Sequence, residues 1–184
     1  MRRFLAQSHC MSNLDRLRSV IRDVPDFPKP GIVFKDITPL LGDPELLQLT
    51  LAAFIEATRP LGVTKIVGIE SRGFIFGAPV AAALGVGFVP VRKKGKLPWQ
   101  CEAISYALEY GEATIEIHRD AIQPGERVVI VDDLLATGGT AAAAAELVKR
   151  LGGEVVEAQF LIELAFLRGK AVLKSVPVRS FLVF

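Results

Sequence analysis

The sequence is poor in cysteine and histidine. Among its 184 residues it has two cysteines, Cys10 and Cys101, and two histidines, His9 and His118. Two thiols do not form the disulfide framework of a small secreted protein, and they fit a reducing compartment, so we expect a cytoplasmic protein. So few ligands at these spacings exclude a metal cluster built from Cys and His. A His-based catalytic triad would have only two candidate histidines.

The sequence also lacks an excess of charge of either sign. It has 22 Lys and Arg against 20 Asp and Glu, a net charge of +2, and 51% of its residues are hydrophobic. This composition excludes disorder as the main description and does not favour a dedicated nucleic-acid-binding protein. The N-terminus begins with basic residues but has no apolar stretch typical of a signal peptide. We therefore expect a globular domain with no nucleic-acid partner.

One uncharged run is long enough to require a membrane test. Residues 74–91 include no charged side chain, and their eighteen positions reach the lower limit for a membrane-spanning helix. Glycines and prolines interrupt the run at five positions. This pattern favours a short helix over 74–84 followed by a buried strand over 87–91. We therefore expect no membrane partner.

The apolar pattern predicts an α/β fold with a mainly parallel sheet flanked by helices. Val- and Ile-rich runs without strict alternation are typical of strands buried on both faces. These runs are 65–69, 87–91, 128–131 and 155–161. Helices are predicted over 45–58, 74–84 and 141–151. After Gly95 the pattern changes, and we expect a long loop over 95–105 and then an antiparallel pair, 106–110 and 114–118, around Gly111.

The most informative segment is Val128–Thr140, which reads VVIVDDLLATGGT. Asp132 and Asp133 follow a predicted buried strand, and the small-residue turn 136–140 opens a helix. Ligands of open α/β sheets bind beyond the carboxyl ends of strands, where such a turn presents N–H groups to a phosphate. Two aspartates beside that turn fit a phosphorylated sugar, which offers hydroxyl groups next to its phosphate. The alternative is an ordinary turn in which the aspartates cap the helix.

Three further segments carry distinctive patterns. Residues 70–74, Glu-Ser-Arg-Gly-Phe, follow a predicted strand and open a helix, either as a ligand site or as an Arg–Glu pair in a turn. Residues 92–96, Arg-Lys-Lys-Gly-Lys, place four cations in five positions, either on a solvated face or beside a highly charged leaving group. Residues 26–36 combine prolines with Ile32, Val33 and Phe34, which are either core or a binding surface.

Taken together, these segments resemble the type I phosphoribosyltransferases, enzymes that use phosphoribosyl pyrophosphate (PRPP). Residues 26–37, 70–74 and 106–111 resemble the adenine phosphoribosyltransferases within that family. The resemblance covers residues 24–184 and implies transfer of a phosphoribosyl group to adenine, giving AMP and pyrophosphate. It also implies a homodimer, and a Mg²⁺ ion held mainly by PRPP and water rather than by protein ligands.

The resemblance implies a domain plan and roles for individual residues. Residues 1–13 are expected to be a disordered extension and residues 14–184 a single domain, with a purine-covering hood over 14–40 and a flexible catalytic loop and antiparallel hairpin over 95–118. The 5-phosphate is assigned to Ala136, Thr137, Gly138, Gly139 and Thr140, and the ribose to Asp132 and Asp133. Pyrophosphate is assigned to Ser71, Arg72, Arg92, Lys93 and Lys96, with a cis peptide entering Ser71. Adenine is assigned to Val33, Phe34, Lys35 and Leu134, and catalysis to Glu109 and Arg72.

Three alternatives remain at this stage. The base could be hypoxanthine, guanine or xanthine, although residues 26–36 favour adenine. The chain could also be a PRPP-sensing regulator that binds nucleic acid, which the net charge of +2 does not favour. Glu109 could be a surface residue of the hairpin rather than a proton-transfer group, since water could serve in its place.

Overall fold

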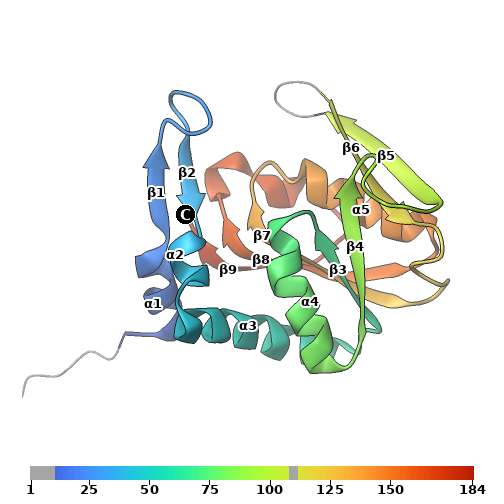
Figure 1. Ribbon diagram of the computed structural model, residues 1–184, viewed down its shortest axis with the longest axis horizontal. Helices are drawn as coiled ribbons and strands as arrows, with labels where there is room; N and C mark the ends of the chain where they lie inside the picture. The colour runs from blue at the N-terminus through green and yellow to red at the C-terminus, as the bar shows by residue number, and fades with distance from the viewer. Residues whose placement is uncertain (1–10, 108–111) are drawn as a thin grey trace, which may run out of the picture. The chain divides into compact units, whose positions relative to one another are not determined.

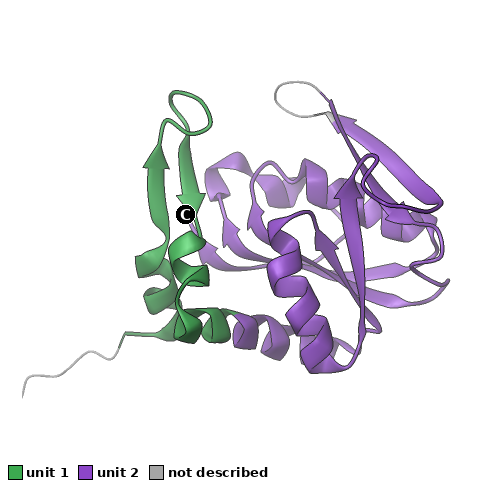
Figure 2. Cartoon of the chain, in the orientation of Figure 1, with its two compact units in different colours: residues 1–50 green, residues 51–184 purple. Residues whose placement is uncertain are grey.

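The computed structural model describes residues 11–107 and 112–184. The chain divides into two compact units, residues 1–50 and 51–184, which are coloured separately in Figure 2. The boundary falls inside helix α3 (Pro44–Thr58). Asn13, the last residue of the predicted extension, already belongs to a helix, α1 (Asn13–Val20). The division into an extension over 1–13 and one domain over 14–184 stays a prediction.

The first unit contains an antiparallel strand pair between short helices. Its elements are α1, β1 (Arg22–Pro25), β2 (Val33–Asp36), α2 (Thr38–Leu41) and the first part of α3. The side chain of Asp43 accepts hydrogen bonds from the N–H groups of Glu45 and Leu46 at 2.9 and 3.0 Å. With Pro44 as the first helical residue, this cap begins α3 where the sequence predicts it. The β1–β2 pair was not predicted, because prolines and a glycine interrupt the apolar pattern there.

The second unit is built on a seven-stranded sheet with the order β5-β6-β4-β3-β7-β8-β9 (Figure 1). Strands β4, β3, β7, β8 and β9 are parallel to one another, and β6 joins β4 antiparallel. This confirms the predicted α/β class and the mainly parallel sheet. The remaining elements of the unit, after the end of α3, are β3 (Lys65–Ile69), α4 (Arg72–Leu84), β4 (Gly87–Lys93), β5 (Cys101–Ala107), β6 (Glu112–His118), β7 (Arg127–Leu135), α5 (Gly139–Arg150), β8 (Glu154–Glu163) and β9 (Val178–Val183), with 3₁₀ turns at Arg59–Leu61, Ala165–Leu167 and Gly169–Ala171.

The central strands are buried on both faces, as their uninterrupted apolar runs predict. Val67 and Ile130 pack in one core cluster with Leu147 of α5, and all three are fully buried. Helix α4 contacts the neighbouring strands β3, β4 and β7 and lies in front of the sheet in Figure 1, whereas α5 lies behind it. This arrangement brings the carboxyl ends of β3, β4 and β7 to the same edge, at the start of α4 and α5.

One local prediction was wrong. Residues 95–105 were expected to form a loop, but β5 begins at Cys101 and pairs with β6 from Cys101 opposite His118 to Ala107 opposite Glu112. Ile104 and Tyr106 pack against the core, while the alternating residues Ala103 and Ser105 are exposed. This alternation is a strand signal, but the small residues Ala103 and Ser105 weaken it. The predicted second strand, 114–118, lies within β6, whereas the predicted first strand, 106–110, overlaps β5 only at 106–107 and otherwise lies outside the described residues.

Candidate active site

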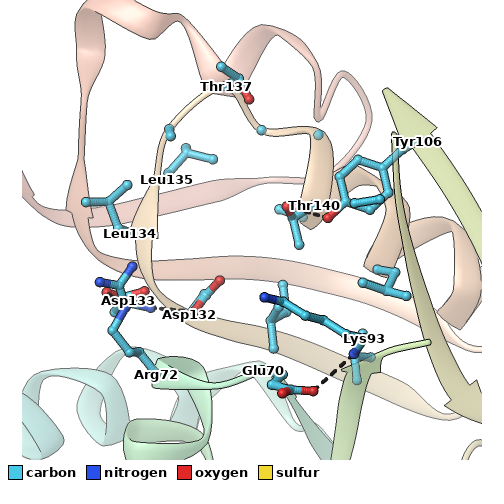
Figure 3. A pocket seen from close by; sticks show the side chains of 18 of the residues that line it. Glu70, Arg72, Lys93, Tyr106, Asp132, Asp133, Leu134, Leu135, Thr137 and Thr140 are labelled. Atoms are coloured by element: carbon cyan, nitrogen blue, oxygen red, sulfur yellow. Dashed lines mark hydrogen bonds and ion pairs between the residues drawn. The ribbon is translucent and has the colours of Figure 1, made fainter. Parts of the chain in front are cut away.

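A cavity of about 640 Å³ lies at the carboxyl-end edge of the sheet in the second unit (Figure 3). It is formed where β3, β4 and β7 end and α4 and α5 begin, with a wall from β5 and β6. Three of the segments identified from the sequence therefore meet in one place. The lining residues include Ile69, Glu70, Ser71, Arg72, Lys93, Lys94, Tyr106, Thr114, Phe160 and residues 132–141.

The loop between β7 and α5 presents backbone N–H groups to this cavity. Gly138 is the N-terminal cap of α5 and has φ +83°, a conformation that glycine adopts without strain. Within the described residues, the N–H groups of Ala136, Thr137 and Gly138 donate no hydrogen bond. The first N–H groups of α5 also lack partners within the helix, because an α-helix leaves its first turn unpaired. The loop therefore leaves several N–H donors available at the start of α5, and anion binding by residues 136–140 stays a prediction.

The loop packs against Gly169, a residue that the sequence interpretation missed. A Cβ atom on Gly138 would lie 2.4 Å from the carbonyl oxygen of Gly169. A Cβ atom on Gly169 would lie 2.2 Å from the carbonyl oxygen of Ala136. Neither distance is compatible with a side chain, so two backbones 31 positions apart are in direct contact. No sequence signal beyond the glycine itself marks this residue.

Asp132 and Asp133 are consecutive residues inside β7, near its carboxyl end, because this strand extends to Leu135 rather than ending at 131 as predicted. The Asp133 carboxylate is 3% exposed and forms an ion pair with Nε of Arg72 at 2.7 Å. The N–H of Asp133 donates to Oδ1 of Asp132 at 2.8 Å. Burial and then the neighbouring Asp133 charge raise the pKa of Asp132 well above its ordinary value. Burial also raises the pKa of Asp133, and the Arg72 charge opposes that shift.

Gly73, at the start of α4, allows this close arrangement. A Cβ atom there would lie 2.7 Å from the carbonyl oxygen of Val131 and 3.0 Å from Oδ1 of Asp132. The helix therefore packs directly against the strand end that carries the two aspartates. The peptide between Glu70 and Ser71 is cis, as the resemblance implies.

Glu70 contacts cations at the end of β4 and just beyond it, because β4 extends past the predicted 87–91 and includes Arg92 and Lys93. Its carboxylate binds Nε of Arg92 at 3.2 Å, the backbone N–H of Lys93 at 3.1 Å, and the ammonium group of Lys96. Burial raises the pKa of Glu70, but the hydrogen bonds from Lys96, Lys93 and Arg92 and the Lys96 charge outweigh it, so the pKa lies below its ordinary value. Arg92 and Lys96 therefore form ion pairs with Glu70. Lys93 and Lys94 line the cavity, and Lys93 is labelled in Figure 3.

A hydrogen bond joins β5 to the start of α5. The hydroxyl groups of Tyr106, on β5, and Thr140, in the first turn of α5, are 2.9 Å apart (Figure 3). Tyr106 was part of the recognised pattern, but no role was assigned to it. This contact gives the hairpin a polar connection to the site that strand pairing alone does not provide.

The residues assigned to adenine come from both units. Leu134 lines the cavity, while Val33, Phe34 and Lys35 belong to β2 of the first unit. There Phe34 packs edge-on against Phe27, with ring centroids 5.2 Å apart, and Lys35 pairs with Asp23. Their meeting at one purine stays a prediction. Glu109 lies outside the described residues.

Across residues 11–107 and 112–184, no helix is long and apolar enough to cross a bilayer. Over the same ranges, no three His, Cys, Asp or Glu side chains are placed to hold a metal ion.

Comparison with known proteins gives a consistent result. The family described as "Phosphoribosyl transferase domain" matches residues 49–175. An adenine phosphoribosyltransferase of Anaeromyxobacter dehalogenans is 57% identical over 171 residues, which cover 93% of this chain and 99% of that protein. The crystal structure of adenine phosphoribosyltransferase from Rhodothermus marinus matches with a TM-score of 0.89 and 59% identity, covering 94% and 98% of the two chains. The Saccharomyces cerevisiae enzyme, complexed with adenine and D-2,5-dideoxy-2,5-imino-altritol 1,6-bisphosphate, matches with a TM-score of 0.87 and 46% identity, covering 92% and 98%.

Proposed function

The chain belongs to the adenine phosphoribosyltransferases, a branch of the phosphoribosyltransferase family, and we propose that the cavity of Figure 3 is its active site. The enzyme transfers the 5-phosphoribosyl group of PRPP to adenine, giving AMP and pyrophosphate. The observation that carries the assignment of the site is the loop 136–138, whose N–H groups lack partners within the described residues, beside the buried Asp133 and the partly buried Asp132.

In this proposal the 5-phosphate binds the loop and the start of α5. The N–H groups of residues 136–140 and the hydroxyls of Thr137 and Thr140 donate to its oxygens. The helix terminus adds a favourable field for an anion. Because these donors are held by the fold before substrate arrives, little ordering is needed on binding.

The ribose hydroxyls bind Asp132 and Asp133 in this proposal. A carboxylate accepts hydrogen bonds from two neighbouring hydroxyls, which matches the vicinal hydroxyls of ribose. Asp133 is paired with Arg72, whereas the ion pairs found among the described residues include none to Asp132. We therefore assign the stronger ribose contact to Asp132 and a shared role with Arg72 to Asp133.

The pyrophosphate group binds on the β3 and β4 side of the cavity. Ser71, Arg72 and Lys93 line the cavity there, and they supply one hydroxyl and two cations. Arg92 and Lys96 act with them through Glu70, which holds both cations near this wall. The site thus stabilises the negative charge that develops on the leaving group, which is the catalytic role we assign to Arg72.

Mg²⁺ fits this site as an ion carried mainly by PRPP. Asp132 is the carboxylate best suited to face it, through water, because burial and the Asp133 charge already disfavour its ionised form. A hydrated divalent ion would relieve that repulsion and needs few direct protein ligands. When bound, it would neutralise charge on the pyrophosphate.

Adenine is assigned to Val33, Phe34, Lys35 and Leu134, with Phe34 and Leu134 on its flat faces. The yeast relative is complexed with adenine, which supports a purine site in this family. Glu109 is assigned to proton transfer at the base. Holding both reactants in line supplies several kcal/mol of the barrier. We further propose a cytoplasmic homodimer, which light scattering of the pure protein would test.

The test of the proposed function is an assay of the pure protein with Mg-PRPP and four purine bases, adenine, hypoxanthine, guanine and xanthine. We expect AMP from adenine and little product from hypoxanthine, guanine or xanthine. Nucleotide formed from hypoxanthine or guanine but not adenine would contradict the assignment of the base. Nucleotide from none of them, with PRPP bound, would favour a regulator over an enzyme.

A further inference from the structure

We propose that Gly169 is a positioning residue for the 5-phosphate, and that it acts by setting the orientation of the loop 136–138 without touching substrate. The inference rests on the proposed function of that loop. Its basis is the mutual contact of the two backbones, in which neither Gly138 nor Gly169 has room for a Cβ atom.

The two glycines are required for different reasons. Gly138 has a positive φ, so its conformation alone favours glycine. Gly169 is not among the residues with positive φ, so another residue could adopt its backbone conformation. Only the approach to the Ala136 carbonyl, with further contacts at 3.1 Å to the N atom of Gly138 and to Leu135, excludes a side chain. The requirement at position 169 is therefore one of close packing.

The contact bears directly on a phosphate donor. The Ala136 carbonyl and the Thr137 N–H belong to one planar peptide, and in a trans peptide they point in opposite directions. The carbonyl side of this peptide lies against Gly169, so the N–H side is turned away from Gly169. A group that displaced the carbonyl would rotate the same plane and change the direction of the Thr137 N–H.

The turn that carries Gly169 is anchored more firmly than the loop it supports. The Gly169 carbonyl accepts from the N–H of Val172 at 3.2 Å, and Lys170 forms an ion pair with the buried Glu163 at 2.6 Å. The N–H of Ala165 donates to the carbonyl of Phe184, and that of Leu164 to the carbonyl of Leu135, each at 2.9 Å. In the loop, the described N–H groups of 136–138 make no such bonds. An added methyl group would therefore displace the loop rather than the turn.

The experiment compares Gly169→Ala with wild type in binding to ribose 5-phosphate and to pyrophosphate, measured by calorimetry, and in steady-state kinetics. We expect the dissociation constant for ribose 5-phosphate and the KM for PRPP to rise at least about tenfold. The pyrophosphate affinity should stay within about twofold and kcat within about threefold. Gly42→Ala is the matched control, because a Cβ atom there meets its nearest neighbour at an ordinary 3.5 Å.

Two further variants keep the outcome decisive. Lys170→Met removes the ion pair to Glu163 and should weaken ribose 5-phosphate binding selectively, by a smaller factor than Gly169→Ala. This variant replaces Gly169→Ala in the test if Gly169→Ala does not fold. Thr140→Val tests the phosphate site itself. If Thr140→Val weakens ribose 5-phosphate but Gly169→Ala and Lys170→Met do not, the inference is overturned and the site stands. If Thr140→Val also has no effect, the proposed site is wrong. Equal losses for ribose 5-phosphate and pyrophosphate in Gly169→Ala would overturn the inference in favour of a general structural role.

Discussion

Replacing Asp132 by Asn should make the protein more stable and a poorer enzyme. The carboxylate is placed beside Asp133 at the end of a buried strand, and burial followed by the Asp133 charge raises its pKa well above 3.8. The folded protein thus holds the proton more tightly than the unfolded chain, and ionisation at neutral pH costs folding free energy. Asn keeps the shape and can still accept the hydrogen bond from the Asp133 N–H, but it carries no charge.

The sign of the pH dependence follows from the raised pKa. Above the folded-state pKa, wild type bears the full cost of the ionised carboxylate, and the Asn variant does not. As the pH falls through the folded pKa towards 3.8, wild type takes up the proton and the stability difference is progressively lost. Each 1 kcal/mol gained would raise Tm by about 2–4 °C in a chain of this size. Thermal unfolding at a series of pH values measures this difference.

Although Asp132→Asn should raise stability, it should weaken the use of PRPP. A hydrogen bond to a charged group contributes about 1.5–3 kcal/mol, so the KM for PRPP should rise by roughly 10- to 150-fold. Adenine binding to the folded protein should change little. Asp120→Asn, at an exposed carboxylate outside the cavity, is the control for charge removal alone. Unchanged PRPP kinetics in Asp132→Asn, or a stability loss at neutral pH, would refute the reasoning.

Three other predictions test the neighbouring groups. Glu70→Gln should lower the free energy of unfolding by about 1 kcal/mol at neutral pH. Because the pKa of Glu70 is depressed, this difference from wild type should be present above pH 4.5 and vanish as the pH falls through the folded-state pKa. Urea denaturation at a series of pH values measures it. Lys93→Met should weaken inhibition by pyrophosphate more than Lys96→Met does, because Lys93 lines the cavity while Lys96 is paired with Glu70; equal effects would contradict the placement. Glu109→Gln should lower kcat by about 10²-fold with PRPP affinity and Tm nearly unchanged, and a kcat within twofold of wild type would remove Glu109 from proton transfer.

The sequence predicted well those features that depend on neighbouring residues. The strand over 65–69 was located to the residue, and the helix after Asp43 begins at its predicted cap. The residues singled out between 132 and 140 all line the cavity, because one contiguous segment supplies both aspartates and the loop, but Leu135 and Ala141 of the same run were not assigned. Local hydrophobic pattern and turn chemistry determine such elements. The extent of β5 was missed because small residues weakened the same kind of signal.

Other features were decided only when strands distant in sequence were packed together. Glu70 binds Arg92 and Lys96 because β3 and β4 are adjacent and parallel. The run of cations over 92–96 is continuous in the sequence, but in the structure two of its members pair with Glu70 and the other two line the cavity. Gly169 meets the phosphate loop because β7 and β8 end together, with Leu135 opposite Glu163. The sequence by itself therefore determined the central strands and main helices of the second unit, the motif and the family resemblance, but not the β1–β2 pair or the extent of β5. The tertiary structure decided which charges face the substrate and which backbone supports the loop, because those depend on distances between segments that no local pattern encodes.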